Sequence, residues 1–315
     1  MPRSLWLLVF TAVVLILQYV PPLDAILMIL GASVWPIITV NLAFAGIVSE
    51  VASGTVPRLW LALPILYFGG NLVLASVSEY QFLHLMKEVE ATNAGQSLPF
   101  AREDSLVIET RQPVVGPVPL ALIETYDIPK VYEKDPSTKR PLYAWRIAAD
   151  PLCKKLWKDQ RDPKSNILTH GVVENGKLVS GMCAYRLTEA PSGRVLSLTV
   201  GKPTEHESFL LPYKKQVITI ADNMGKSVEL LYAEATPWFW LPMPVGGCFR
   251  GPGESKSRCF FEPLRIFTMP ALGSVADTPA LVAKALNLNR SPASRRRDEI
   301  SSAGMLSDLR PSLSF

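Results

Sequence analysis

The chain has 315 residues, of which 48% are hydrophobic and only 19% are charged, and its formal net charge is +4 at pH 7. Soluble domains average about 25% charged residues, so part of this chain is expected to lie in lipid. The first 80 residues contain only five Asp, Glu, Lys and Arg residues. These counts exclude a wholly soluble enzyme, a disordered protein, a coiled coil and a disulfide-dense mini-protein, and they favour an integral membrane protein with one sizeable water-exposed domain.

The first apolar run covers residues 4–20 and contains no ionisable side chain other than that of Tyr19. Because about 20 apolar residues cross a hydrocarbon core of about 30 Å as a helix, the run predicts a first membrane span. A cleaved signal peptide is the alternative, since Arg3 gives the chain a short positive start. Against cleavage, no small-x-small site ends the run, and Pro21 and Pro22 favour a tight turn into a second apolar run.

Two further apolar runs, residues 25–48 and 59–78, predict the second and third spans and complete a three-helix region over residues 1–78. The ring of Pro36 removes a backbone donor and is expected to kink the second span. Polar and small residues inside the spans predict helix packing by amide hydrogen bonds and close approach. These residues are Asn41, Gly69, Gly70 and Asn71. The three runs lack Asp, Glu, Lys, Arg and His, so a transport subunit with an ion relay is the weakest alternative.

Basic residues beside the spans predict the orientation of the chain. Arg3 and the free amino terminus favour a cytoplasmic start, and Arg58 is the one basic residue in the loops between the spans. Three crossings then carry the rest of the chain out of the cytoplasm. In a bacterium the protein would lie in the inner (plasma) membrane with a periplasmic carboxy-terminal domain, and in a eukaryote that domain would be lumenal or extracellular.

Residues 79–95 follow the third span and predict a juxtamembrane helix. Their apolar residues recur at helical spacing, and Gly95 supplies a stop. Residues 96–116 are polar and contain proline, with one short apolar run at residues 106–108. We therefore expect a linker between the juxtamembrane helix and the domain that follows.

From residue 117 to residue 270 the sequence changes to short runs of branched and aromatic residues separated by turn signals, which is typical of strands. The runs are PVPLALIET, PLYAWRIAA, KLVSGMCAYRL, GRVLSLTV, KQVITIA and SVELLYAEA. Asn175-Gly176 is a strong hairpin signal, and residues 191–193 and 222–225 mark two further reversals. These turns predict a mainly antiparallel β-rich domain.

Two helices are predicted outside this strand pattern. The first covers residues 150–158, with Asp150 as the cap and Pro151 in the first turn. The second is a short helix within residues 271–290, which begins at Asp277 and has apolar positions at helical spacing.

All four cysteines lie beyond the predicted spans, where an even number favours two disulfides in an oxidising compartment. Four cysteines allow three pairings. We expect Cys248 to pair with Cys259, because the Gly, Pro and Ser-rich stretch between them can double back, and Cys153 to pair with Cys183. The alternative is four free thiols in a cytosolic domain. Zinc binding lacks support, because there is no C-x-x-C pair and the three histidines have no ligand spacing.

An aromatic cluster, Trp238, Phe239 and Trp240, precedes the Cys248 loop. Core packing is the simplest interpretation, but consecutive residues of a strand cannot all point inward, so at least one ring should face outward. An exposed ring beside a rigid loop predicts a docking surface for a protein or for the membrane interface. Basic side chains would line its rim: Arg250, Lys256 and Arg258.

Residues 291–315 form a polar, serine-rich tail, which we expect to be mobile. Its Arg295–Arg297 triplet could bind anionic lipid or nucleic acid, but Asp298 and Glu299 follow directly. A solvated tail is the simpler interpretation.

The common catalytic motifs are missing from the sequence. Gly225-Lys226-Ser227 resembles the end of a phosphate-binding loop, but the required first glycine is replaced by Ile220. There is no G-x-S-x-G, H-E-x-x-H or G-x-G-x-x-G pattern. Cys183 with His170 is the remaining candidate for a nucleophile and its base, although a disulfide or burial of Cys183 explains the residue more simply.

The sequence thus predicts an α+β membrane protein, with three N-terminal transmembrane helices followed by a mainly antiparallel β extracytoplasmic domain. We expect a periplasmic binding or assembly accessory protein of a secretion, pilus or conjugation apparatus; the alternative is a membrane-anchored envelope hydrolase. Membrane lipid and envelope proteins are the expected partners, nucleic acid is not expected, and homo-oligomerisation stays open. No catalytic residue, cofactor or metal is predicted.

Overall fold

The computed structural model divides the chain into two compact units. Unit 1 comprises Met1–Leu85, Glu205–Tyr213 and Glu234–Met269, and unit 2 comprises Met86–Thr204, Lys214–Ala233 and Pro270–Phe315. The predicted domain over residues 117–270 is therefore divided, because two of its segments belong with the amino-terminal helices. The residues that the structure describes are 2–20, 23–109, 118–134, 142–161, 167–174, 176–249, 258–273, 275 and 277–303.

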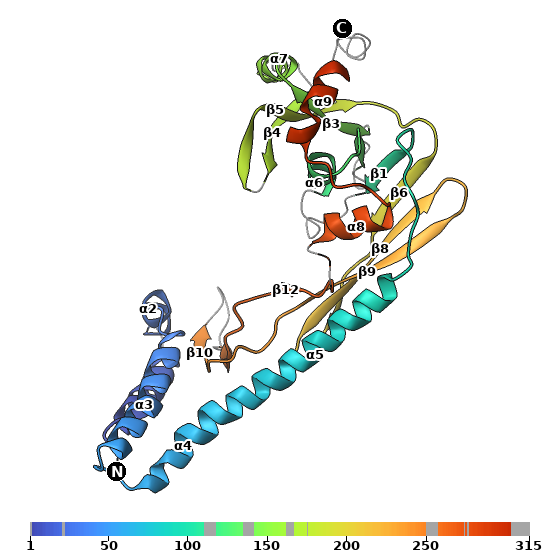
Figure 1. Ribbon diagram of the computed structural model, residues 1–315. Helices are drawn as coiled ribbons and strands as arrows, with labels where there is room; N and C mark the ends of the chain where they lie inside the picture. The colour runs from blue at the N-terminus through green and yellow to red at the C-terminus, as the bar shows by residue number, and fades with distance from the viewer. Residues whose placement is uncertain are drawn as a thin grey trace. The chain divides into compact units, whose positions relative to one another are not determined.

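Unit 1 begins with apolar helices (Figure 1). In chain order they are α1 (Leu5–Leu17), α2 (Leu23–Ile29), α3 (Trp35–Ala52), the short turns η1 (Arg58–Leu61) and α4 (Ala62–Pro64), the π-helical turn η2 (Ile65–Gly69) and α5 (Gly70–Asn93). Two continuous helical stretches, Trp35–Ala52 and Arg58–Asn93, are long and apolar enough to cross a membrane, and α1 is shorter.

The predicted second span, residues 25–48, is not one helix. The chain leaves α2 after Ile29, turns at Gly31 with φ +70°, and starts α3 at Trp35. Pro36 lies in the first turn of α3 and so does not kink a longer helix. A proline suits this position because its missing amide has no partner there and its φ is already helical.

The third predicted span and the juxtamembrane helix are continuous, as expected. Pro64, which has no amide hydrogen, directly precedes the π-helical turn, and α5 then runs to Asn93. Gly95, with φ +78°, follows the end of α5 and provides the predicted stop.

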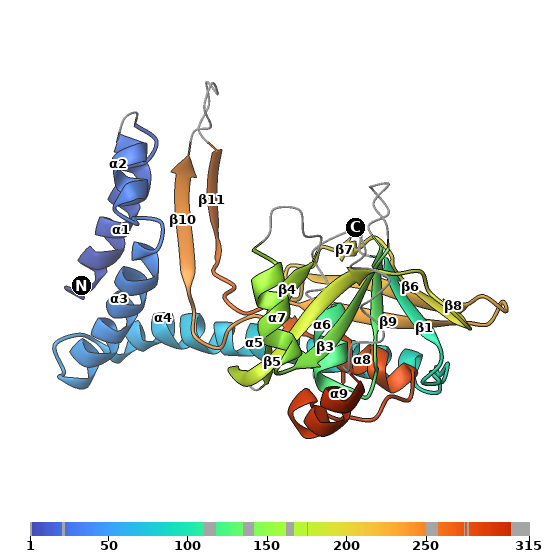
Figure 2. The same cartoon turned by 90° about the horizontal axis from the view of Figure 1, so that it is seen from above.

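A two-stranded antiparallel hairpin completes unit 1 (Figure 2). It consists of β10 (Pro244–Phe249) and β11 (Arg258–Pro263), and its register places Cys248 opposite Cys259. The segments before and after the hairpin belong to the same unit as α1–α4.

Most of unit 2 is built on a mixed sheet of order β12-β9-β8-β6-β1-β2-β3-β5-β4. The central strand β1 is parallel to β2 and to β6, whereas β2–β3, β3–β5, β4–β5 and β6–β8 are antiparallel. The strands are β1 (Ser105–Glu109), β2 (Val131–Lys134), β3 (Tyr143–Ala149), β4 (Leu168–Glu174), β5 (Lys177–Thr188), β6 (Val195–Val200), β8 (Tyr213–Asp222), β9 (Ser227–Ala235) and β12 (Met269–Pro270), with β7 (Thr204–His206) off this order. The expectation of a mainly antiparallel sheet is confirmed.

The segment 96–116, predicted to be a linker, contains the central strand of this sheet. Leu106, Val107 and Ile108 of β1 are all buried. A strand with a parallel neighbour on each side is covered on both faces, so it has a continuous apolar run without alternation. A run of three residues in a polar stretch was too short a signal to predict it.

The run PVPLALIET, predicted to be a strand, forms the helix α6 (Val118–Thr125). Pro119 lies in its first turn, and Val118 and Leu122 are buried four residues apart on one face. A short run that is apolar throughout has neither a period of two nor one of 3.6, and this explains the wrong assignment.

The other strand predictions correspond to β3, β5, β6, β8 and β9, and both predicted helices are present as α7 (Leu152–Asp159) and α8 (Thr278–Ala285). Asp277 caps α8 by accepting a hydrogen bond from the Ala280 amide at 2.8 Å. Asp150 does not cap α7, because its carboxylate forms an ion pair with Lys154 at 3.1 Å.

The first part of the predicted mobile tail is ordered. Residues 293–303 form η4 (Ala293–Arg296) and α9 (Arg297–Ala303), and Ala293 is fully buried. The Arg296 guanidinium donates to the Ile123 carbonyl at 2.6 Å and to the Ser291 carbonyl at 2.8 Å, so this arginine is not simply solvated. Residues 304–315 lie outside the described residues.

Candidate functional site

An uncharged segment of unit 1 forms the candidate site. Residues 235–249, here called the aromatic segment, contain no Asp, Glu, Lys, Arg or His. Pro237, Pro242 and Pro244 remove backbone donors and exclude a helix. The segment therefore stays extended until it enters β10, and it must obtain hydrogen-bond partners from elsewhere.

Asn71 of α5 supplies three of these hydrogen bonds. Its Nδ2 donates to the Trp240 carbonyl at 2.7 Å and to the Phe239 carbonyl at 3.1 Å. Its Oδ1 accepts a hydrogen bond from Nε1 of Trp238 at 2.7 Å. One amide thus holds both the backbone and a side chain of the aromatic cluster.

Two more polar side chains of the apolar helices bind the segment on either side of this contact. Ser78 of α5 is fully buried; its Oγ accepts from the Trp238 amide at 2.9 Å and donates to the Leu210 carbonyl at 2.6 Å. Asn41 of α3 donates to the Pro242 carbonyl at 2.8 Å. The contacts from three polar side chains therefore fasten residues 238–242 along two helices.

The strand β10 is bound by the ends of α1 and α3. The Gly246 amide donates to the Ser33 carbonyl at 3.1 Å, and the Cys248 amide donates to Oε1 of the fully buried Gln18 at 3.0 Å. A Cβ at position 247 would lie 3.3 Å from Gln18 Oε1 and also 3.3 Å from the sulfur of Met28. A side chain at position 247 would therefore crowd the approach of β10 to these helices.

These contacts change the interpretation of the predicted helix-packing residues. Asn41 and Asn71 bind the aromatic segment, and among the described residues neither side chain bonds to a neighbouring helix. The space beside Gly69 and Gly70 is open among the described residues, so no helix approaches there. Gln18 and Ser78 were not predicted as site residues, although each is an isolated polar residue within or next to an apolar helix.

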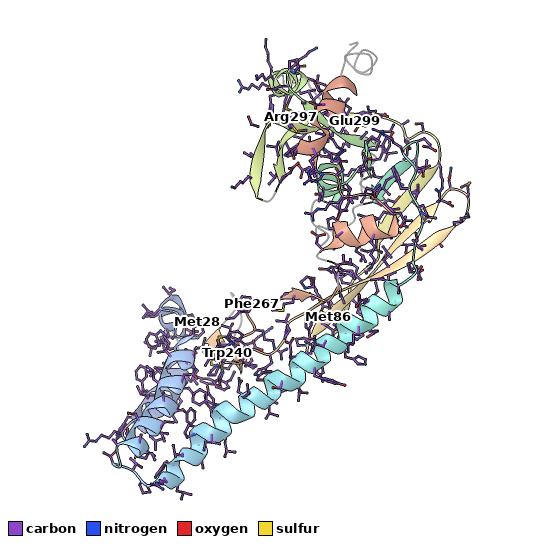
Figure 3. The ribbon with its side chains drawn as sticks, viewed as in Figure 1. Met28, Met86, Trp240, Phe267, Arg297 and Glu299 are labelled. Carbon is purple, nitrogen blue, oxygen red and sulfur yellow. A yellow bond between two sulfur atoms is a disulfide. The ribbon has the colours of Figure 1, made fainter. Side chains whose placement is uncertain are left out.

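The three clustered rings differ in exposure. Trp238 is half-buried, with the Phe209 ring at 5.1 Å and the Arg265 guanidinium over its face at 5.5 Å. Phe239 contacts the rings of Trp240 and Phe267 at 5.5 and 6.1 Å. Trp240 is 63% exposed, so one ring of the cluster faces outward (Figure 3).

Trp240 is one of six exposed large apolar side chains among the described residues of the segments Glu205–Tyr213 and Glu234–Met269 of unit 1, which together we call the aromatic face. Its members are Phe209, Trp240, Phe261, Ile266, Phe267 and Met269. Of the predicted basic rim, Arg250 and Lys256 lie outside the described residues, and Arg258 is the first residue of β11. Arg265 was missed; it donates to the carbonyls of Thr236, at 3.3 Å, and Phe209.

Both disulfides are present with the predicted pairing. Cys248–Cys259 closes the β10–β11 hairpin, and Cys153–Cys183 fastens α7 to β5. The sulfur of Cys183 is therefore unavailable as a nucleophile. His170 lies on the neighbouring strand as predicted, with its ring 5.5 Å from that of Trp145.

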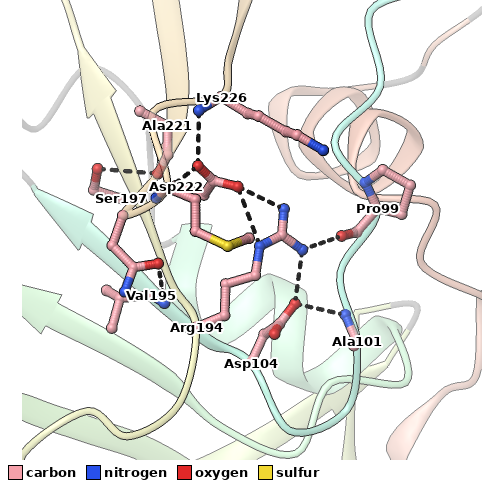
Figure 4. A network of polar contacts seen from close by, with 11 residues as sticks. Pro99, Ala101, Asp104, Arg194, Val195, Ser197, Ala221, Asp222 and Lys226 are labelled. Carbon is pink, nitrogen blue, oxygen red and sulfur yellow. Dashed lines mark hydrogen bonds and ion pairs between the residues drawn. The ribbon is translucent and has the colours of Figure 1, made fainter.

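Unit 2 contains a buried network of charged groups that fixes the loop before β1 (Figure 4). Arg194 binds Asp222 at 2.9 Å, Asp104 at 3.3 Å and the Pro99 carbonyl at 3.1 Å. Burial alone would raise the pKa of Asp222, but hydrogen bonds from the Lys226 amide and from Arg194 outweigh burial and lower it. All these groups bind one another, which indicates a structural role.

Glu124 of α6 is a half-buried carboxyl group with an unusual proton affinity. Burial raises its pKa to about 7, and the nearby charge of Glu174 acts in the same direction, against a hydrogen bond from the Val173 amide. At neutral pH this side chain is therefore only partly ionised.

Glu189 behaves in the opposite way. Burial would raise its pKa, but hydrogen bonds from Lys130 at 2.8 Å and Tyr132 at 3.0 Å, together with Arg146, lower it. The carboxylate joins two cationic side chains across β2 and β3.

The described residues offer little chemistry beyond these contacts. They contain no group of three or more His, Cys, Asp and Glu side chains that could hold a metal ion. Unit 2 has a cavity of about 200 Å³ whose lining includes Glu90, Asn93 and Lys284. Ligand pockets usually measure about 300–1,000 Å³, so this cavity is small for a cofactor.

No family model, curated protein or solved structure matches the chain.

Proposed function

We propose that the protein is anchored in the inner (plasma) membrane by three crossings and presents unit 2 outside the cytoplasm, as an accessory binding module of an envelope assembly such as a secretion, pilus or conjugation apparatus. The observation that carries this proposal is the outer surface of the apolar helices. Large apolar side chains of α1, α2, α3 and α5 are exposed, among them Trp6, Ile29, Ile38 and Leu72. An apolar surface of this extent is typical of a protein that contacts lipid.

Contacts within unit 1 support the proposed orientation. Both carboxylate oxygens of Glu50, near the end of α3, accept hydrogen bonds at 2.8 Å from the amides of Arg3 and Ser4, at the start of α1. Thr11 and Thr39, near the middle of the two helices, are joined at 2.5 Å. The helices therefore run in opposite directions, and the amino terminus lies on the same side as the loop that contains Arg58, as two basic cytoplasmic segments require.

The disulfides support an extracytoplasmic location for unit 2, because disulfides form and persist mainly in oxidising compartments. A binding role is favoured over the envelope-hydrolase alternative, since Cys183, which was the candidate nucleophile, is bonded to Cys153. The expected partner of unit 2 is an envelope protein.

The location is tested by labelling intact cells that produce the full chain with a membrane-impermeant maleimide. Met224 is exposed in the turn between β8 and β9, and Thr55 is exposed in the loop after α3. We expect Met224→Cys to be labelled in intact cells and Thr55→Cys only after permeabilisation. The parent chain should remain unlabelled because its cysteines are paired. Labelling at Thr55→Cys alone, or free thiols in the parent chain, would refute the proposal.

The binding role is tested separately by crosslinking in intact cells and mass spectrometry of the purified full chain. Crosslinks from unit 2 to the same envelope protein in independent preparations are expected. If unit 2 yields only crosslinks within its own chain, the accessory role fails even where the location is correct.

A further inference from the structure

The depth of each contact in unit 1 can be counted along the helices, given the proposed membrane anchoring. An α-helix rises about 1.5 Å per residue, so Asn71 lies about 20 Å and Ser78 about 30 Å along the helix from Arg58, at the cytoplasmic boundary. On α3, Asn41 lies about 14 Å from Glu50 at the same boundary. Because the hydrocarbon core is about 30 Å thick, Ser78 reaches its outer edge and Asn41 lies near its middle.

The aromatic segment contacts these residues in order of depth. Its Trp238 amide binds Ser78, its Trp240 carbonyl binds Asn71 and its Pro242 carbonyl binds Asn41. The chain therefore descends from the outer edge of the hydrocarbon to its middle between Trp238 and Pro242.

The strand β10 then returns to the outer edge. Its Gly246 and Cys248 amides bind Ser33 and Gln18, which lie at the outer ends of α3 and α1. Ser33 lies about 12 Å above Asn41 along the helix direction, and four extended residues from Pro242 to Gly246 cover about 13 Å. The two independent estimates of depth agree.

The second strand of the hairpin and the residues after it span the same depth as the first. The strand β11 pairs with β10 throughout, and the Leu264 amide then donates to the Met243 carbonyl at 2.7 Å, at the lowest part of the segment. The rings of Phe267 and Phe239 are 6.1 Å apart. Phe267 therefore lies near the part of the aromatic segment that bonds to Asn71 and Ser78.

The two legs of the hairpin differ in charge. Residues 235–249, which include both the descent to Pro242 and the return through β10, are uncharged. The strand β11 carries Arg258 at its start and an exposed Glu262 opposite Val245. Arg265 reaches the Thr236 and Phe209 carbonyls near the outer edge, as a cationic side chain in an interface does. Backbone N–H and C=O groups at membrane depth need hydrogen-bond partners within the protein. The side chains of Asn71, Asn41, Ser78 and Gln18 provide such partners.

From this geometry we infer that residues 238–249 and 258–267 form a re-entrant membrane insertion, which enters the outer leaflet, is deepest at Pro242, and places the aromatic face against lipid acyl chains. The lipid surface is favoured over a protein partner because the face belongs to the same unit as the exposed apolar helices, and because the segment that carries Trp240 is hydrogen-bonded to Asn41 and Asn71 of those helices. The inference rests on the proposed membrane anchoring.

The test places the photo-crosslinking residue benzoylphenylalanine at single positions of the full chain in nanodiscs of phosphatidylethanolamine and phosphatidylglycerol, and in cells. Trp240 is the test position. Leu72 on the outer surface of α5 is the lipid control, and Met224 in unit 2 is the water control. After irradiation we expect a mass increase of one phospholipid at Trp240 and Leu72, and none at Met224.

The outcomes separate this inference from the proposed anchoring. A lipid adduct at Leu72 with none at Trp240 overturns the insertion and leaves the anchoring intact. A protein adduct at Trp240 in cells overturns it in favour of a protein docking surface. Failure at both Leu72 and Trp240 overturns the anchoring itself.

A second measurement avoids the unnatural residue. In vesicles of brominated-acyl phosphatidylcholine, Trp240→Phe should remove part of the quenchable tryptophan fluorescence. The matched change Trp157→Phe, at an exposed tryptophan of unit 2, should leave the quenched part unchanged. Equal quenching in Trp240→Phe and the parent chain contradicts lipid contact.

Discussion

The contact of Asn71 with the aromatic cluster gives a sharp test of how unit 1 is held together. Asn71→Leu keeps the size of the side chain but removes the amide. Three hydrogen bonds are lost: those to the Phe239 and Trp240 carbonyls and that from the Trp238 indole. The two carbonyls and the indole N–H are left without their partner, and at the proposed membrane depth water does not replace it.

The magnitude follows from measured side-chain hydrogen bonds in membrane proteins, which average about 0.6 kcal/mol and reach about 1.7 kcal/mol. Three such bonds give an expected loss of about 2 to 5 kcal/mol in the free energy of unfolding. At the lower limit the ratio of folded to unfolded protein falls by about 30-fold, since 1.4 kcal/mol corresponds to tenfold.

The assay is unfolding of the full chain in mixed micelles by increasing sodium dodecyl sulfate, followed by circular dichroism and tryptophan fluorescence. Ser76→Ala is the matched control, because Ser76 is an exposed residue of the same helix and bonds only to the Leu72 carbonyl. We expect it to change stability by no more than about 0.5 kcal/mol. If Asn71→Leu and Ser76→Ala unfold at the same detergent fraction, the contact does not hold unit 1 together.

A double-mutant cycle isolates the side-chain part of this contact. Trp238→Phe removes the indole donor and keeps an aromatic ring. Combined with Asn71→Leu, it should show a coupling energy of about 0.6 to 1.7 kcal/mol. A coupling of zero would mean that the bond from Nε1 to Oδ1 contributes nothing, and that the backbone contacts carry the whole effect.

Four further changes have defined outcomes in the same unfolding assay or in native-state hydrogen exchange. Replacing Cys248 and Cys259 together by Ser should lower stability by about 3 kcal/mol, because the disulfide closes a loop of 11 residues; no change on replacement or on reduction would contradict this. Gly247→Leu should separate β10 from Gln18 and Met28 and increase amide exchange at the end of α1, whereas unaltered exchange there would show that the strand tolerates a side chain. The pKa of Glu124 is raised in the folded protein, so unit 2 should lose stability as the pH rises from about 4.5 to 7, and Glu124→Gln should stabilise it at pH 8 by about 1 kcal/mol after allowing for solvent screening. The pKa of Glu189 is lowered in the folded protein, so its contribution to the stability of unit 2 is present at neutral pH and is lost on acidification through the folded pKa. Glu189→Gln should therefore destabilise unit 2 at pH 7. An effect of the opposite sign in Glu124→Gln or Glu189→Gln would show that the pKa shift of that residue has been misassigned.

Local signals predicted the parts of the fold that depend on local chemistry. The Glu174–Lys177 reversal follows from Asn175-Gly176, and the α8 cap follows from Asp277. The Cys248–Cys259 pairing followed from the turn-forming stretch between the two cysteines. In each case the residues that decide the structure lie within a few positions of one another, so a single sequence contains the whole reason.

The strand β1 and the helix α6 could not be predicted from such local signals. Both are short runs that are apolar throughout, and both are buried on more than one side. Their conformation is decided by neighbours: β1 is completed by β2 and β6, the latter about 90 residues away in sequence. Hydrophobic periodicity cannot predict a conformation that is decided by tertiary contacts.

The sequence could indicate the two parts of the candidate site, the polar residues of the helices and the aromatic segment, but not their contact. The sequence shows isolated polar residues, such as Asn41 and Asn71, in apolar helices, and hydrogen-bonding groups in such surroundings need partners inside the protein. Those partners were expected on other helices, because helices were the only other elements predicted within the apolar region. The true partner is the extended aromatic segment, which is 201 residues from Asn41 at the Pro242 contact.

A physical reason links the two halves. An extended, proline-containing segment has backbone carbonyls that cannot pair within it, whereas an apolar helix pairs its own backbone and leaves its amide side chains without partners. Each element therefore lacks what the other offers, and the aromatic segment is the longest uncharged stretch outside the predicted spans. An uncharged, proline-rich segment far from apolar helices that contain single Asn, Gln or Ser residues thus predicts an insertion beside those helices. The lipid-adduct measurement at Trp240 tests that rule directly.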